Sequence, residues 1–184
     1  MKHLGFGGAN TLTGLKFELE VHFEDLLAAK LGYEVRPIQG KAGKGVFYEG
    51  QLVARCFKKH DFYRFLEEQG VDWKAKVSKR LLPDDALLVI VRETLFIIEV
   101  KYQQVAGSVD EKLQTCDFKR KQYVKLVAEL GLKVEYVYVL NDWFKDPAYK
   151  DVLDYIHSVN CHYKFGALPL AWLGLPDPAD APSK

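Results

Sequence analysis

Acidic residues and a lysine stand at the two ends of one long apolar stretch. Pro83-Asp84-Asp85 comes directly before the apolar run Ala86–Val91, and Glu99-Val100-Lys101 ends the next run, which begins at Leu95. A strand alternates its side chains between two faces, so Glu99 and Lys101 share a face and Val100 has the opposite one. A carboxylate and an ammonium at the end of an apolar strand are costly unless that end opens into a polar site.

The two ends of this stretch should meet in the folded chain. The turn near Arg92–Thr94 is about equally far in sequence from the aspartates and from Glu99 and Lys101. In an antiparallel hairpin the start of one strand lies beside the end of the next. Two carboxylates there would make an oxygen-rich site suited to Mg²⁺, which proteins hold with one or two carboxylates, water and phosphate. An adjacent lysine can orient an attacking water or neutralise charge on a phosphate, so the pattern favours phosphodiester hydrolysis.

The elements that position these residues follow from the spacing of apolar residues. Helical spacing from Leu15 to Leu27 predicts a helix over 15–31, with Thr13 as N-cap and Gly32 as the stop. The pattern further predicts a strand over 33–38, a hairpin of 46–48 and 51–57, a helix over 61–69, the central hairpin of 86–91 and 95–101, a helix over 109–130 capped by Ser108, a strand over 134–140 and a helix over 149–158. We expect one α/β domain over residues 1–184, with a lead-in at 1–14 and a flexible tail at 176–184.

The composition is that of a globular protein and excludes several other classes. Of the 184 residues, 48% are hydrophobic and 28% charged, and the 26 Lys and Arg against 25 Asp and Glu give a formal net charge of +1. A nucleic-acid surface would therefore need local clusters of cations. The longest apolar run is far too short to span a bilayer. Three widely spaced cysteines without a CxxC pair argue against a zinc ribbon or a disulfide framework and predict a cytoplasmic protein.

The stretch Pro83-Asp84…Glu99-Val100-Lys101 resembles the signature of the PD-(D/E)XK nuclease superfamily, which includes most type II restriction endonucleases. The expected order of elements over about 15–140 is similar to that family's αβββαβ core, a mixed central sheet flanked by helices. In this comparison the strands around 46–57 are an insertion. The run from Lys101 to Lys112, with its glycine-containing loop, also looks like the stretch that follows the motif in restriction-type members.

The resemblance implies a role for each residue of the motif. Asp84 and Glu99 would be metal ligands, Lys101 would position the nucleophilic water, and the backbone carbonyl of Val100 could also touch the metal. Members often add a glutamate from the first helix, for which Glu18 is our candidate; the alternative is a solvated helix carboxylate. Asp84 matches the spacing of the motif, and Asp85 is the alternative ligand if the strand begins one residue later, because a slip of one residue exchanges the faces.

Cations that flank the motif in sequence are candidates for DNA binding. Gln103 shares the face of Lys101 if the strand continues, and its amide could bind a phosphate; the alternative is an edge-strand glutamine in water. The candidate DNA-binding residues are Lys41, Lys44, Lys79, Arg80, Gln103, Lys112, Lys119 and Lys121. Clustered cations gain affinity for phosphates by releasing counterions, whereas their alternative role is a solvated charged face.

Together these features predict a Mg²⁺-dependent endonuclease that cuts double-stranded DNA, as the resemblance implies for a type II restriction enzyme. The Gln-x-x-x-Tyr helix motif of exonuclease-like relatives is absent, since Gln114 is followed at the fourth position by Phe118. Two cuts at a palindrome imply a homodimer, because the two-fold symmetry of the protein matches that of the site. The alternatives are a repair or junction-resolving nuclease and a non-catalytic DNA-binding module.

Overall fold

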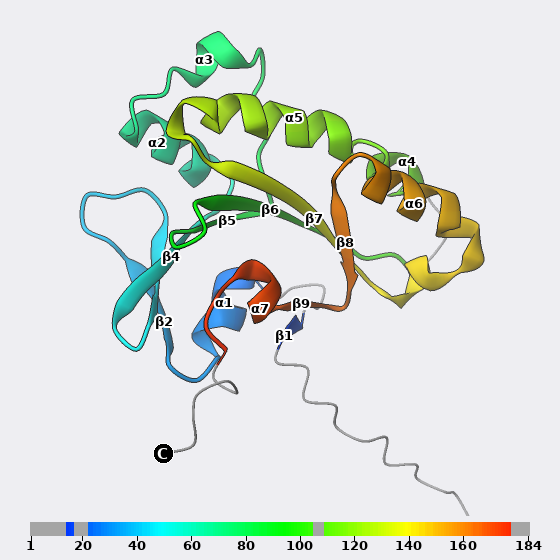
Figure 1. Cartoon of the computed structure of the whole chain (residues 1–184), viewed down its shortest axis with the longest axis horizontal. Coiled ribbons are helices and arrows are strands. Elements are labelled where there is room, and N and C mark those ends of the chain that lie inside the picture. The colour runs from blue at the N-terminus through cyan, green and yellow to red at the C-terminus, as the bar shows by residue number, and fades with distance from the viewer. Residues whose placement is uncertain (1–13, 17–21, 105–108, 178–184) are drawn as a thin grey trace, which may run out of the picture.

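A seven-stranded mixed sheet forms the centre of the chain in the computed structural model, which describes residues 14–16, 22–104 and 109–177 (Figure 1). The strand order is β2-β3-β4-β5-β6-β7-β8; neighbours from β2 to β6 are antiparallel, whereas β6–β7 and β7–β8 are parallel. A separate two-stranded sheet pairs β1 with β9. The strands are β1 (Gly14–Lys16), β2 (Tyr33–Pro37), β3 (Lys44–Tyr48), β4 (Gln51–Phe57), β5 (Asp85–Val89), β6 (Thr94–Lys101), β7 (Lys133–Leu140), β8 (His162–Phe165) and β9 (Ala167–Pro169).

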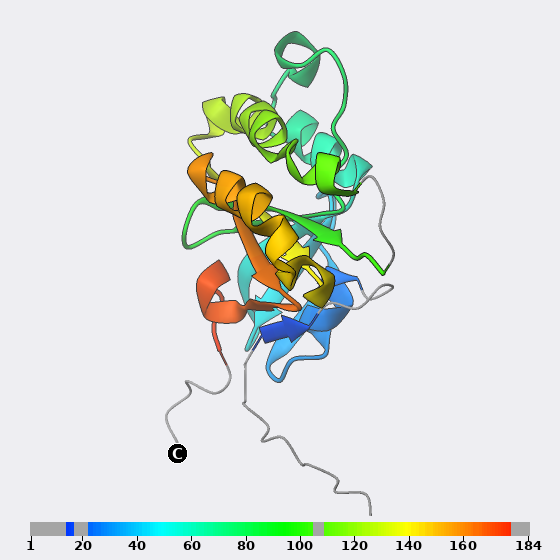
Figure 2. The ribbon, with the colours of Figure 1, turned by 90° about the vertical axis from the view of Figure 1, so that its right-hand side faces the viewer.

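Helices cover both faces of the large sheet (Figures 1 and 2). The helices are α1 (Phe23–Ala28), α2 (His60–Glu68), α3 (Trp73–Lys76), α4 (Val109–Leu113), α5 (Cys116–Val127), α6 (Lys150–Ser158) and α7 (Leu170–Leu173), with single turns of 3-10 helix at η1 (Ala128–Leu130), η2 (Asp142–Lys145) and η3 (Pro147–Tyr149). We call the face that packs against α2, α5 and α6 the α5 face, and the face that packs against α1 and α7 the α1 face.

The strand β6 contributes to both cores, because alternate residues point to opposite faces. Leu95 and Ile97 are buried on the α5 face, whereas Phe96 and Ile98 are buried on the α1 face. A strand that is covered on both sides has no polar face, which explains why β6 is an almost continuous apolar run in sequence. Glu99 and Lys101 continue the α5-face series at the end of this strand.

The expected α/β class, with a mixed central sheet flanked by helices, is confirmed. Both predicted hairpins are present, as β3–β4 and β5–β6. In the first, Tyr48 pairs with Gln51 across the two-residue loop Glu49-Gly50, and both loop residues have positive φ angles of 48° and 80°. A two-residue hairpin loop with positive φ at both positions matches the right-handed twist of its strands.

The helix expected over 15–31 is wrong at its start. Gly14–Lys16 form β1, which pairs with β9, and the helix α1 covers only Phe23–Ala28. The partner of β1 lies about 150 residues further along the chain, so local apolar spacing contains no signal for this strand. The N-cap candidate Thr13 and the stretch 17–21 lie outside the described residues.

The single helix expected over 109–130 is divided into α4, α5 and η1. Thr115 Oγ donates a hydrogen bond of 2.7 Å to the carbonyl of Lys112, and the hydroxyl of Tyr138 donates to the same carbonyl at 3.1 Å. These side chains engage the carbonyl that a continuing helix would pair with the amide of Cys116, so the helix restarts there. The proposed cap Ser108 lies outside the described residues.

Two strands and a helix near the C-terminal end were not predicted. β8 adds a parallel strand to the edge at β7, and β9 and α7 follow it on the α1 face. The expected strand over 33–38 and the helices over 61–69 and 149–158 are confirmed with shifts of one residue at their ends. Within the described residues, no helix combines the length and the apolar character that crossing a bilayer requires.

Candidate active site

The structure brings Asp84, Glu99 and Lys101 together at one end of the β5–β6 hairpin. Lys101 Nζ lies 3.0 Å from Glu99 Oε2 and 3.9 Å from Asp84 Oδ2. Glu99 Oε2 and Asp84 Oδ2 are therefore no further apart than the sum of these two distances. The pairing of β6 with β5 ends at Ile98, whereas the pairing of β6 with β7 continues to Lys101. The last residues of β6 thus lie at a rim where the two antiparallel strands separate.

Glu99 is the buried centre of this cluster, with 5% of its surface exposed. Lys119 Nζ, from α5, donates to both of its oxygens at 2.8 and 2.9 Å, and the Tyr136 hydroxyl donates to Oε1. Burial by itself would raise the pKa of Glu99, but Lys101 and Lys119 outweigh it and hold the pKa below its usual range. Glu99 therefore stays ionised in a largely apolar setting.

Tyr136 fixes the position of the Glu99 carboxylate. Burial, with the adjacent charge of Glu99, raises the pKa of Tyr136 well above its usual value, so the hydroxyl remains a donor. The next residue of β7 on this face is Tyr138, whose ring centre lies 6.0 Å from Lys101 Nζ. Both tyrosines stand on the α5 face with Val137 between them on the other side.

Asp84 and Asp85 lie on opposite faces of the sheet. Asp84, whose side chain is 55% exposed, is at the rim beside Lys101; partial burial raises its pKa, and Lys101 opposes that rise. Asp85 pairs with Ile98, whose side chain belongs to the α1-face core, and Asp85 is 8% exposed. Burial raises the pKa of Asp85 to about 7. Of the two candidate ligands, the structure places only Asp84 on the face of Glu99.

A second acidic and basic cluster occupies the α1 face at the same end of the sheet. Glu24 Oε1, from α1, lies 2.8 Å from Lys58 Nζ and 3.0 Å from Lys44 Nζ. The candidate first-helix glutamate, Glu18, lies outside the described residues. Glu24 does not take its place, because Glu24 shares the α1 face with Asp85 rather than the α5 face with Glu99.

Val100 and Gln103 complete the end of β6. Val100 packs its side chain against the α1-face core, so only its backbone can belong to the site. Gln103 is 5% exposed, which excludes the alternative of an edge glutamine in water. Its backbone amide donates to Asn141 Oδ1 at 3.2 Å, and Asn141 Nδ2 donates to its carbonyl at 2.8 Å. Asn141 therefore continues the pairing of β6 with β7 through its side chain.

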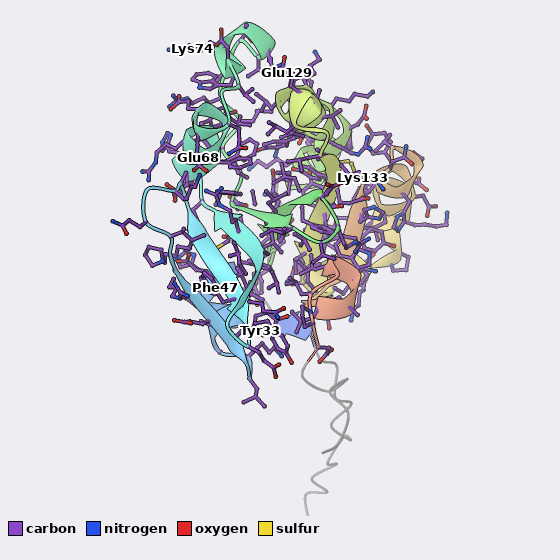
Figure 3. The ribbon with its side chains drawn as sticks, turned by 60° about the vertical axis from the view of Figure 1, so that its left-hand side comes forward. Tyr33, Phe47, Glu68, Lys74, Glu129 and Lys133 are labelled. Carbon is purple, nitrogen blue, oxygen red and sulfur yellow. The ribbon has the colours of Figure 1, made fainter. Side chains whose placement is uncertain are left out.

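The other candidate DNA-binding cations are spread over several elements. Lys119 differs from them because its ammonium is bound to Glu99 inside the site. Lys41 pairs with Glu68 at 3.3 Å, Lys44 with Glu24, and Lys121 with Asp117 at 2.7 Å, while Lys79, Arg80 and Lys112 are exposed. The Arg80 guanidinium stacks 4.4 Å from the centre of the Trp73 ring. Figure 3 shows Lys74, on the neighbouring α3, at the opposite end of the molecule from Tyr33.

Sequence reasoning did not assign Tyr136 to the site, and it named Lys119 only as a candidate DNA-binding cation, not as a contact of Glu99. The spacing of Tyr136 and Tyr138 in a predicted strand placed both on one face, but nothing in the pattern showed that a carboxylate lay beside them. Lys119 was one cation among several on a predicted helix. Its contact with Glu99 depends on how α5 crosses the sheet, which local sequence does not specify.

The donor set suits Mg²⁺ among the common metals. Within residues 14–16, 22–104 and 109–177, no three His, Cys, Asp or Glu side chains converge as metal ligands. Two carboxylates with water and phosphate are the usual protein contribution to Mg²⁺ sites, whereas Zn²⁺ and Ca²⁺ take more protein ligands. Lys101 and Lys119 balance the charges of Asp84 and Glu99, so a divalent ion would compete with these ammonium groups for the carboxylates. Asp84 and Glu99, with the backbone of Val100, are the residues that could hold the ion.

No family model, no curated protein and no solved structure matches this chain.

Proposed function

We propose that this chain is a Mg²⁺-dependent endonuclease that cuts double-stranded DNA, on a core like that of the PD-(D/E)XK nucleases and of the type II restriction kind. One observation carries the proposal: Lys101 lies between Asp84 and Glu99 at the rim of the β5–β6 hairpin. Two carboxylates that can hold a metal ion and an amine that can orient water are groups that can catalyse phosphodiester hydrolysis.

Each group has a role that its surroundings support. Bound Mg²⁺ would supply charge stabilisation at the scissile phosphate. Glu99, kept ionised by Lys101 and Lys119 and held by Tyr136, provides a fixed negative charge. Lys101 Nζ, with 20% of its side chain exposed, can donate a hydrogen bond that orients the attacking water towards phosphorus. Asp84 reaches the solvent side of the same cluster, where the substrate would enter.

The exposed cations of the α5-face side are the proposed contacts to the DNA backbone. Lys79, Arg80 and Lys112 are all exposed. Lys79 and Arg80 follow α3, where Arg80 lies 4.0 Å from Glu67, and Lys112 belongs to α4. Contacts of this kind fix the position of a duplex without reading its sequence. A homodimer would place two such sites on a palindrome, and the three free cysteines are compatible with the cytoplasm that we propose for the chain.

One observation favours the alternative of a non-catalytic DNA-binding module. Both oxygens of Glu99 are engaged by Lys119, an arrangement that could serve only to finish the hairpin. A purely structural ion pair would need no divalent cation for any activity of the chain. The two functions therefore differ in their response to Mg²⁺.

A plasmid-cleavage assay separates the candidate functions. Supercoiled DNA is incubated with the purified chain in Mg²⁺, and a parallel sample contains EDTA. Discrete fragments that EDTA abolishes support a restriction enzyme, and sequencing their ends would give the recognition site. Structure-selective cuts would instead support a repair or junction-resolving nuclease. DNA binding without cleavage over a range of Mg²⁺ concentrations and DNA sequences would contradict the proposed activity.

A further inference from the structure

Three hydrogen bonds and one further ion pair surround the Glu99 carboxylate. An ionised carboxylate offers about four lone-pair positions. Lys119 Nζ takes one on each oxygen, at 2.8 and 2.9 Å, Lys101 Nζ lies 3.0 Å from Oε2, and the Tyr136 hydroxyl donates to Oε1. A metal ion that binds this carboxylate would therefore compete with these three groups.

Of the three groups, Lys119 has the most exposed side chain. The Tyr136 side chain is wholly buried, and Lys101 is held between Glu99 and Asp84 on the strand itself. Lys119 comes from α5, which packs over the strand, and its side chain is the most exposed of the three at 26%. The flexible four-carbon stem of a lysine allows its ammonium to move to solvent without a change in the backbone.

We infer that Lys119 acts as an internal cation that occupies the position of Mg²⁺ on Glu99, so that the metal and the ammonium compete for this carboxylate. The inference rests on the function proposed above and adds a regulatory feature to the same site. Because this ammonium donates to both oxygens of Glu99, a Mg²⁺ ion bound to either oxygen at its usual bond length of about 2.1 Å would compete with it for the carboxylate. Metal uptake then requires the release of Lys119 from Glu99.

Binding of Mg²⁺ to the DNA-free chain tests this competition without any measurement of cleavage. Mg²⁺ is titrated into wild type and Lys119→Met, and binding is followed by the amide NMR shifts of residues 99–101. Loss of the competing ammonium should tighten Mg²⁺ binding by about tenfold or more, since a hydrogen bond to a charged group is worth about 1.5–3 kcal/mol. Lys121→Met is the matched control on the same helix, because Lys121 pairs with Asp117 instead; it should change the affinity less than twofold.

A Glu99→Gln background distinguishes direct competition from loss of a nearby positive charge. If Lys119 acts by occupying Glu99, then Lys119→Met should tighten Mg²⁺ binding strongly in the chain that keeps Glu99. The same substitution should have little effect in the Glu99→Gln chain. An equal gain in both backgrounds, or equal affinity of wild type and Lys119→Met, would overturn the inference and leave the proposed nuclease intact. Failure of all variants to bind Mg²⁺ would overturn both. Circular dichroism confirms folding, and Lys119→Gln replaces any Met variant that does not fold.

Discussion

Asp84 and Asp85 are adjacent in sequence, yet they have different surroundings. Asp84 lies at the rim of the α5 face, beside Lys101 and half exposed to solvent. Asp85 is buried on the α1 face, and its pKa is raised to about 7. Asp85 is the first residue of β5 and Asp84 directly precedes the strand, so the two neighbours are separated where the strand begins. The raised pKa of Asp85 disfavours the ionised form that a metal ligand needs, whereas Asp84 is exposed beside Lys101.

The raised pKa of Asp85 should appear in the pH dependence of stability. Between its unfolded value of 3.8 and about 7, the folded state binds more protons than the unfolded state, so the stabilising effect of the neutral carboxyl is lost as the pH rises. Asp85→Asn cannot ionise, and its unfolding free energy should fall less than that of wild type over this range, by on the order of 2 kcal/mol. Urea unfolding of both chains from pH 4 to pH 8 measures the difference.

Comparing wild type with Asp85→Asn removes the contribution of the other carboxyls to the pH dependence of the unfolding free energy. Glu68, beside Arg55, has its pKa lowered to about 2, so its stabilisation is present above pH 4.5 and lost towards pH 2 in both chains. It therefore cancels in the difference between wild type and Asp85→Asn. Parallel pH curves for the two chains would show that Asp85 is not buried as a neutral group.

At the scale of elements, the end of β6 is held in place by a side chain of the segment that follows β7. The side chain of Asn141 donates to and accepts from the backbone of Gln103, two residues beyond Lys101. The backbone amide of Asn141 donates to the Lys101 carbonyl at 3.4 Å. These bonds replace two rungs of the sheet ladder after the strand pairing has ended at Lys101–Leu140. The position of Lys101 therefore depends on the β6–β7 pair more than on β5.

Replacement of Asn141 should loosen this end of the sheet. Asn141→Ala removes two hydrogen bonds to a buried backbone segment, and it should lower the free energy of unfolding by about 1–3 kcal/mol. The amide of Gln103 should lose protection in hydrogen exchange. Asp142→Ala, at an exposed neighbouring position, is the control and should leave both quantities unchanged. Unchanged exchange at Gln103 in the Asn141→Ala chain would show that the strand end is held by other contacts.

Elements with local signals were predictable, and elements with distant partners were not. The β5–β6 hairpin was visible as two apolar runs around a short turn, and its geometry placed Asp84 near Glu99. The division between α4 and α5 depends on Tyr138, which reaches Lys112 from another strand. β1 depends on β9, at the other end of the chain. For the same reason the acid and the amine of the motif could be predicted, whereas the contact of Lys119 with Glu99 could not.

At the scale of the whole molecule, a formal net charge of +1 leaves DNA affinity to local cations. Lys74 and Lys79 are exposed near α3, which extends beyond α2 at one end of the molecule (Figure 1). Lys145 and Lys150, in contrast, are paired with Asp142 and Asp154 at 2.7 Å. Because aspartates already balance the charges of Lys145 and Lys150, we expect Lys74 and Lys79 to contribute more to phosphate binding.

The salt dependence of DNA binding tests this assignment. If Lys74 and Lys79 each contact one phosphate, the Lys74→Ala, Lys79→Ala double variant should weaken binding of any duplex to a similar degree. Its plot of log K against log salt should also be less steep than that of wild type, by about 2. The Lys145→Ala, Lys150→Ala double variant removes the same formal charge and should keep the wild-type slope. Fluorescence anisotropy with labelled duplexes, in Ca²⁺ to prevent cleavage, gives both values. Equal slopes for the two variants would exclude α3 as a contact region.

The proposed catalytic rim is tested most directly by cleavage rates of Asp84→Asn and Asp85→Asn at saturating Mg²⁺. These substitutions make the same replacement of a carboxyl by an amide at neighbouring residues on opposite faces of the sheet. We expect Asp84→Asn to slow plasmid cleavage by about a hundredfold or more and Asp85→Asn to keep a rate close to wild type. The opposite result, or full activity in both variants, would contradict a site formed by Asp84, Glu99 and Lys101 on the α5 face.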